Sequence, residues 1–444
     1  MDTTGAQGVG NRKLPKGCCE IVSDKFNFDD SVQLESAQES NFTGFVRPIG
    51  GMEAGSPYTF KLESMADSFL QMNSLYFYVK CKVVDESGDD LTDTSKVGLV
   101  NAFGLSFFNN IQVHLNEFQI GAGTDIDIAY KNYIETMLSY ETEARTTHLR
   151  TSIFELDSMD HLEKFDPTTA DNKPFKIRAK KIAKSKEFDF TAPLCADLLR
   201  ADNHLAPGNS LLIKAIKNND SFLLKSETLN AGFKILVRDI RLYYNRIRLD
   251  PTLTPKILGG VQKYLCAKTV VKRFILPSGL TTYNAEIFNG PLPRTIVLAQ
   301  VLTSAANGNY SKNPFNIRHF DVNRVSLRIN GQSLPSDGYT PDFENNLYAR
   351  EYTELFVNTG TWRSDRGASV SFDRFKKGST FFVWDTTNDR CNSMHLHPTK
   401  SGLVELEMNW SKALPSPITL IVYAAYNQRI TISGLKEPAL EEII

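Results

Sequence analysis

Residues 75–84 read LYFYVKCKVV, and this segment carries the clearest signal of the fold class of the chain. Its apolar residues alternate from Leu75 to Val83, while Lys80 and Lys82 lie between them. Successive side chains of a strand point to opposite faces of a sheet, so the alternation predicts a strand with one buried face. The same pattern returns at residues 111–115, 233–237, 325–329, 404–408 and 418–426. We therefore predict a chain that is mainly β.

The composition fits a globular protein without a strong overall charge. The 444 residues are 41% hydrophobic, and 50 Lys and Arg face 51 Asp and Glu, which leaves a net charge of −1. A nearly neutral chain creates no strong electrostatic field that would attract the whole protein to polyanions or membrane surfaces. A dedicated nucleic-acid-binding protein is therefore not expected. The length predicts two domains or one very large domain.

Helical patterns are rare in this sequence. Apolar residues recur at helical spacing from Ile126 to Leu138, which predicts an amphipathic helix packed on the first β domain. A shorter helix is predicted after Pro251, between the two halves of the chain. Because helical patterns do not separate successive strands, two tandem β-sandwiches are favoured over a parallel α/β fold. Asn-Gly pairs at residues 289–290, 307–308 and 330–331 predict tight turns.

We expect the chain to stay inside the cell that makes it, in the cytoplasm or the nucleus. Its first residues, MDTTGAQGVGNRKLPKGCCE, lack the apolar core of a secretory signal, and no apolar run reaches the ~18 residues that a membrane span requires. Residues 1 to about 40 lack periodicity and predict a flexible arm. The cysteines are scattered and are expected to be thiols: Cys18, Cys19, Cys81, Cys195, Cys266 and Cys391.

His395 and His397 are the best candidates for a catalytic or metal site. Alternate residues of a strand share a face, so two imidazoles spaced in this way are able to hold one metal ion. A cupin-type site also needs a Glu within a few residues and a His from a later strand, but the next Glu is Glu405 and no His follows. The phosphate-loop, dinucleotide, hydrolase and zincin motifs are absent as well. We therefore favour two surface histidines in a loop.

The strongest charge feature is FKIRAKKIAKSKEF at residues 175–188. Such a basic run is able to contact phosphate or to act as a nuclear address, whereas a solvated loop is the simpler interpretation. Aromatic residues that would stack on bases are missing from its interior, so sequence-specific or single-strand binding is not expected. Its basic residues are Lys176, Arg178, Lys180, Lys181, Lys184 and Lys186.

Longer stretches of the chain resemble a known family. The first half contains NSLYFYVKCKVV, VNAFGLSFFNNIQVHLNE and FKILVRDIRLYYNRIRLDP, and the second contains VVKRFILPSGLTTYNAEIFNGPLPRTIVLAQV, YSKNPFNIRHFDVNRVSLRINGQSLP and PDFENNLYAREYTELF. With these segments, from about residue 58 to 432, the chain resembles the major capsid proteins of Polinton (Maverick) elements and related adintovirus-like viruses. The most specific segment is residues 312–320, followed by a strand and an Asn-Gly turn.

The resemblance implies an all-β fold of two tandem eight-stranded jelly rolls, with a few short helices in inserted loops. They would occupy residues 42–250 and 264–432, with an arm at 1–41, a linker at 251–263 and a tail at 433–444. The resemblance also implies that three copies form a homotrimer, the pseudo-hexameric capsomer, and that capsomers contact one another in an icosahedral virion capsid. A single jelly-roll penton protein would be a further partner. The capsid would enclose double-stranded DNA and contact it non-specifically at most. No catalytic motif belongs to this family, so no enzyme activity and no cofactor are expected.

Other interpretations stay open. A non-capsid jelly roll would serve as a carbohydrate or receptor-binding module, or as a cupin-like metalloenzyme at His395 and His397. A domesticated transposon relic without an assembly role is a third alternative, although the strand patterning is intact throughout. The basic segment and the arm match no motif of the family, so their placement is open.

Overall fold

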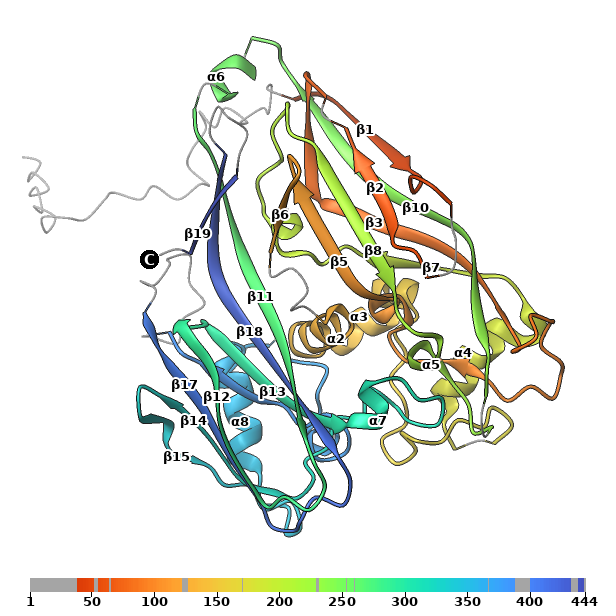
Figure 1. The fold of residues 1–444 in the computed structure, drawn as a ribbon, viewed down its shortest axis with the longest axis vertical. Coiled ribbons are helices and arrows are strands. Elements are labelled where there is room, and N and C mark those ends of the chain that lie inside the picture. The colour runs from red at the N-terminus through yellow and green to blue at the C-terminus, as the bar shows by residue number, and fades with distance from the viewer. Residues whose placement is uncertain are drawn as a thin grey trace, which may run out of the picture.

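The computed structural model describes residues 38–51, 55–63, 65–121, 127–169, 171–228, 231–252, 254–258, 260–365, 367–387, 400–432 and 438–442. Two β-sandwiches lie side by side, and the helices α2 (Ile128–Ser139) and α3 (Thr142–Thr146) are placed between them (Figure 1). None of the helices in these residues is long and apolar enough to span a membrane.

The first sandwich consists of two four-stranded antiparallel sheets. One sheet has the order β1 (Gln38–Val46), β10 (Lys234–Leu249), β3 (Ser68–Val84), β7 (Phe188–Pro193). The other has the order β2 (Tyr58–Leu62), β8 (Leu211–Lys217), β5 (Phe108–Leu115), β6 (Phe118–Ile120). The short strands β4 (Gly98–Leu99) and β9 (Leu224–Lys225) pair beside them.

The second sandwich repeats this strand order. One sheet runs β11 (Gln262–Leu276), β18 (Ile418–Ile432), β13 (Thr295–Leu302), β16 (Phe382–Asp385), with β19 (Pro438–Glu442) paired to β18. The other runs β12 (Thr282–Pro291), β17 (Ser401–Trp410), β14 (Val322–Ile329), β15 (Gln332–Tyr339). In each sandwich the first strand pairs with the last, and the second pairs with the seventh of eight. This order is that of a jelly roll, so the chain is a double jelly roll as predicted.

The inserted helices also occupy corresponding places in the two jelly rolls. The β6–β7 connection carries α2, α3 and α4 (Lys173–Ile182), and the β15–β16 connection carries α8 (Ala349–Asn358) and α9 (Phe372–Lys376). Single helical turns form α1 (Phe103–Ser106), α5 (Asp220–Leu223) and α7 (Thr303–Ala306), and 3-10 turns lie at His148–Ser152, Ala183–Ser185 and Asp197–Arg200, the last of which is η4. The predicted linker helix is present as α6 (Thr254–Leu258).

Strand β3 shows how the alternation of side chains specifies the sandwich. Phe77, Val79 and Cys81 point into the sandwich and are fully buried, while Lys80 and Lys82 lie on the outer face. Burying one such apolar side chain contributes about 1.5–3 kcal/mol, so the pattern specifies which face of the strand turns inward.

The turn predictions have mixed outcomes. Asn330 and Gly331 take the positive φ values of the β14–β15 turn, which confirms that prediction. Asn289 and Gly290 lie inside β12, so the turn predicted there is wrong.

Two features of the structure differ from the sequence interpretations. The basic segment is not a solvated loop, because most of it forms α4, which Asn172 caps at its start and which buries Phe175, Ala179 and Ile182. The described strands also extend past the expected limits of the jelly rolls, since β1 begins within the expected arm and β19 lies within the expected tail.

Candidate functional site at the junction of the two jelly rolls

Helix α2 is anchored to the first jelly roll. The Asp127 side chain caps it by accepting a hydrogen bond from the Tyr130 amide at 3.3 Å. The Asn132 side-chain amide donates to the carbonyl of Leu105 at 2.8 Å, and the helix packs on α1 and β5. Within the helix all residues except Glu135 and Ser139 are buried, so it is far more enclosed than its amphipathic pattern predicts. Other contacts of the helix come from the second jelly roll.

Two tyrosines of α2 meet the second jelly roll directly. The Tyr130 hydroxyl donates to the carbonyl of Pro314 at 2.9 Å. The Tyr133 ring stacks on Phe315, with ring centroids 4.2 Å apart and an interplanar angle of 15°. Burial raises the pKa of Tyr133 to about 12, so its phenol stays neutral and serves as a packing group. The sequence interpretation that this helix packs on the first β domain is therefore incomplete, because it joins both domains.

Polar contacts extend the junction over the outer face of strands β11 and β18. The Lys131 ammonium lies 2.5 Å from the Asp197 carboxylate, and both side chains are buried. Asp197 also accepts a hydrogen bond from the Thr269 amide of β11 at 2.7 Å. The Tyr423 hydroxyl of β18 donates to Glu135 of α2 at 3.0 Å. Residues of the first jelly roll thus cover this face of the second.

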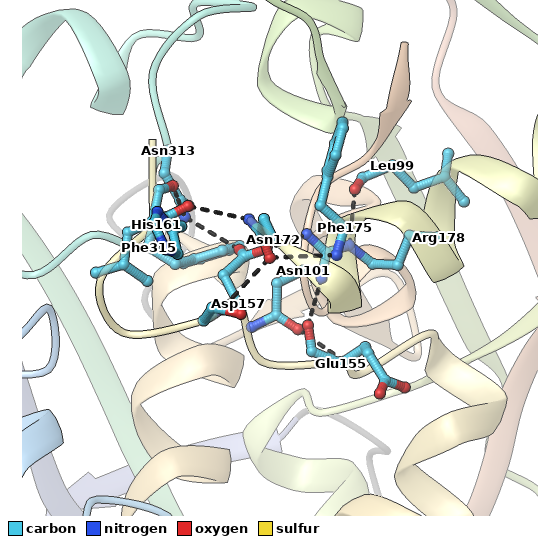
Figure 2. A network of polar contacts seen from close by, with 12 residues as sticks. Leu99, Asn101, Glu155, Asp157, His161, Asn172, Phe175, Arg178, Asn313 and Phe315 are labelled. Carbon is cyan, nitrogen blue, oxygen red and sulfur yellow. Dashed lines mark hydrogen bonds and ion pairs between the residues drawn. The ribbon is translucent and has the colours of Figure 1, made fainter. Parts of the chain in front are cut away.

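A buried arginine forms the centre of a second group of contacts (Figure 2). The Arg178 guanidinium of α4 lies 2.5 Å from the Asp157 carboxylate, and both side chains are nearly inaccessible to solvent. Arg178 also donates to the carbonyls of Leu99 and Glu155, at 2.9 and 2.5 Å. Asp157 accepts a further bond from the Asn172 amide at 3.0 Å. Several hydrogen bonds therefore satisfy the buried charges, as a buried ion pair requires.

Asn313 connects this network to the second jelly roll. Its side-chain amide donates to the Asp157 carboxylate at 3.2 Å, and its backbone amide donates to Glu163 at 2.9 Å. Burial raises the pKa of Glu163. Nearby, the buried Lys225 ammonium donates to the carbonyl of Asn309 at 2.8 Å, and burial lowers its pKa to about 7. Charged groups of the first jelly roll thus bind the 309–316 loop of the second at several points.

The arrangement is suited to holding two domains rather than to chemistry. Arg178 and Asp157 are enclosed and are bound by atoms of the chain itself, which leaves neither group facing a substrate. Close packing of aromatic rings beside a satisfied polar network resists sliding and rotation. We conclude that the junction fixes the relative orientation of the two jelly rolls.

The predicted basic residues do not all lie together. Arg178 belongs to the buried network and is not available to a partner. Lys180, Lys181, Lys184 and Lys186 are exposed, and Lys184 pairs with Asp93 at 3.0 Å. Lys176 is partly exposed on the same helix. These five lysines form what we call the α4 lysine surface, at the end of the first jelly roll farthest from α6 (Figure 1).

The other predicted candidates give no reactive site in the described residues. His395, His397 and Cys391 lie outside them, as do Cys18 and Cys19. No group of three or more His, Cys, Asp or Glu residues is arranged to hold a metal in the part of the chain that the structure describes. Burial raises the pKa of the Cys266 thiol to about 12 and lowers the pKa of His319, which stacks on Phe343, to about 4. Both groups are therefore uncharged near neutral pH.

Sequence reasoning missed the residues that make the junction. Asp157, Asn172 and Asn313 are common polar residues whose spacing follows no motif, and they meet only in the folded chain. One local signal was present, since Asn172 precedes Pro174 at the start of a helix, which is a typical capping arrangement. Phe315 and Asn313 also lie in the segment that carries the most specific resemblance.

Comparison with known proteins places this geometry among viral capsid folds. No family model matches the chain. An uncharacterized protein of Caenorhabditis elegans is 24% identical over 426 residues, which cover 92% of this chain and 98% of that protein. Among solved structures, a chain of the Sputnik virophage has a TM-score of 0.66 at 11% identity, covering 98% of this chain and 95% of its own.

Two named capsid proteins show the same fold. The Faustovirus major capsid protein has a TM-score of 0.57 at 11% identity, over 91% of this chain and 92% of its own. The mavirus major capsid protein has a TM-score of 0.53 at 9% identity, over 97% of both chains. The fold of the chain is thus the double jelly roll found in virophage and giant-virus major capsid proteins.

Proposed function

We propose that the chain is a major capsid protein of the Polinton (Maverick) type. Three copies would form a pseudo-hexameric capsomer, and capsomers would tile an icosahedral shell around double-stranded DNA. The observation that carries this proposal is the repetition of one jelly-roll strand order in two domains that a buried junction holds together. Three such two-domain subunits supply six similar blocks, which is what a pseudo-hexagonal building unit requires.

Further properties of the proposed role follow from the same architecture. Closely paired jelly-roll sheets leave few exposed strand edges, while the loops at their ends are free to vary. Partners would be neighbouring capsomers and a single jelly-roll penton protein, and the protein would reside in the virion capsid. The enclosed network at the junction agrees with a structural role in which no substrate is turned over.

The proposal is tested by measuring the mass of the purified full-length chain with size-exclusion chromatography and multi-angle light scattering. We expect a particle of about 150 kDa, three times the subunit mass of 49.8 kDa. Obligate interfaces of this kind are large and apolar, so the particle should persist on dilution to micromolar concentration. A monomer that stays monomeric when concentrated would contradict the proposal.

We also propose that the α4 lysine surface is the part of the chain that contacts packaged DNA, without sequence preference. Changing Lys180 and Lys181 to Glu should weaken binding of duplex DNA, and the slope of log K against log salt should fall by about 1 for each phosphate that is no longer neutralised. Fluorescence anisotropy between 50 and 200 mM salt measures this. The control changes the exposed Lys263 and Lys412 of the second jelly roll to Glu, which gives the same net charge away from α4. An unchanged slope in the Lys180 and Lys181 variant would refute the assignment.

A further inference from the structure

The outer face of the sheet β1-β10-β3-β7 carries an uncovered row of aromatic residues. Phe45 pairs with Tyr243 across β1 and β10, and Tyr243 pairs with Tyr76 across β10 and β3. The Phe45 and Tyr243 rings are 5.6 Å apart, and the Tyr243 and Tyr76 rings stack at 5.2 Å. Phe45 is 47% exposed and Tyr76 is 38% exposed. We call Phe45, Tyr76 and Tyr243 the aromatic row.

The corresponding face of the second jelly roll is covered within the same chain. Strands β11 and β18 occupy the places of β1 and β10 in the repeated strand order. Val271 pairs there with Tyr423, and the Tyr423 hydroxyl is bound by Glu135 of α2. The cover comes from the β6–β7 insert, whose helix α2 packs on β5, and from η4 in the β7–β8 connection, which packs on β3 and β11.

The surface that would provide an equivalent cover is also exposed. In the second jelly roll the equivalent of the β6–β7 insert is the β15–β16 insert, residues 340–381, whose helix α8 packs on β16. This insert carries three exposed apolar side chains: Leu347, Trp362 and Phe372, which are 67%, 50% and 41% exposed. Strands β14 and β15 lie at one side of the subunit and β1 and β10 at the other (Figure 1). A single subunit is therefore unable to bring the two surfaces together.

We propose that the aromatic row is the docking surface for the β15–β16 insert of a second copy of this chain. This inference rests on the proposed capsid function and names the surfaces that would carry its subunit contacts. The contact would repeat, between copies, the arrangement that joins the two jelly rolls within one copy. It is heterologous, since two different surfaces meet, and such contacts close into rings when the rotation permits.

The charges around the row favour an apolar partner. Arg241 lies over the Phe45 ring at 5.0 Å and pairs with Asp239 at 2.6 Å. The Tyr78 hydroxyl donates to Asp189 at 3.2 Å. Because these groups already have partners within the face, burying it needs no compensating charge from the other copy. Exposed Trp and Tyr residues are also the side chains that most often dominate the energy of protein interfaces.

The first test changes Phe45 and Tyr76 to Glu together and measures the mass of the full chain at 10 μM. The expected result is loss of the assembled particle, with at least a tenfold rise in the monomer fraction. The matched control is Phe118→Glu, because Phe118 is 45% exposed but lies on β6, away from the row. Trp362→Glu should weaken assembly in the same way as the changes in the row. Far-UV circular dichroism spectra equal to that of the unmodified chain will show that the variants are folded, since the thermal midpoint itself is expected to fall when assembly is lost.

The second test identifies the partner surface. A benzoylphenylalanine photocrosslinker placed at position 243 should join to residues 340–381 of another copy, as read by mass spectrometry. Crosslinks to residues 234–249 of the other copy would instead show a symmetric pairing and overturn the proposal. If the unmodified chain assembles and the Phe45 and Tyr76 double variant assembles equally well, this docking surface is wrong while the capsid proposal stands. A chain that is monomeric at every concentration would overturn both.

Discussion

Replacing Arg178 by leucine is expected to destabilise the folded chain by about 3–5 kcal/mol. The change leaves the Asp157 carboxylate buried without its cation, and it removes the donors that bind the carbonyls of Leu99 and Glu155. An unpaired buried charge costs far more than the pair itself contributes, because the desolvation of the remaining carboxylate is no longer offset. Thermal unfolding followed by circular dichroism should show a midpoint lower by about 3–5 °C, because a chain of this length that unfolds in one transition has an unfolding entropy of about 0.9 kcal/mol/K.

The control for this prediction is a surface ion pair. Lys80 and Glu187 are 2.6 Å apart, but both side chains are more than 40% exposed. Lys80→Met should therefore leave the thermal midpoint almost unchanged, because solvent and salt screen an exposed pair. A double variant, Arg178→Leu with Asp157→Leu, should recover part of the stability, since neither charge is then buried alone. Equal effects of Arg178→Leu and Lys80→Met would show that the buried network contributes little.

Replacing Phe315 by alanine is expected to separate the unfolding of the two jelly rolls. Phe315 belongs to the second jelly roll, but its ring stacks on Tyr133 and meets Phe222 edge-on at 5.8 Å, and both residues belong to the first. Truncating a buried Phe typically costs about 3–5 kcal/mol, and here the cost falls on the packing between domains. Calorimetry should resolve two transitions where the unmodified chain shows one, and limited proteolysis should cut more readily near residues 251–263.

Phe382→Ala provides the matched control. Phe382 is equally buried, but its ring contacts Phe375, Tyr339 and Trp384, all of which belong to the second jelly roll. We expect a similar decrease in stability without the appearance of a second transition. If Phe315→Ala and Phe382→Ala give the same calorimetric profile, the Tyr133–Phe315 stack does not couple the domains. The capsomer proposal would then need another source of rigidity within the subunit.

The fold is largely predictable because its signals are local. Strand alternation depends only on the two-residue period of a strand and on the burial of one of its faces. In β3 it places Phe77, Val79 and Cys81 inside the sandwich and Lys80 and Lys82 outside it. The helix at Ile128–Ser139 is visible for the same reason, from its helical period. The Asn330-Gly331 turn is predictable because both residues accept positive φ at little steric cost.

The errors have physical causes too. Helix α4 escapes sequence analysis because its buried side includes an arginine, so the surrounding charges mask its apolar stripe of Phe175, Ala179 and Ile182. The Asn289-Gly290 pair favours a turn locally, whereas pairing with β17 keeps both residues in a strand. In both cases tertiary contacts outweigh a local preference.

The amino-acid sequence alone specifies the two β-sandwiches and the helix at Ile128–Ser139, because each depends on patterns that repeat over short distances along the chain. Tertiary structure was needed to learn which residues hold the subunit together and which surfaces remain free. Asp157 and Asn313 are far apart in sequence, as are Phe45 and Tyr243, and they meet because of strand order and domain placement. No local pattern specifies such pairings, since they arise from the packing of the whole chain.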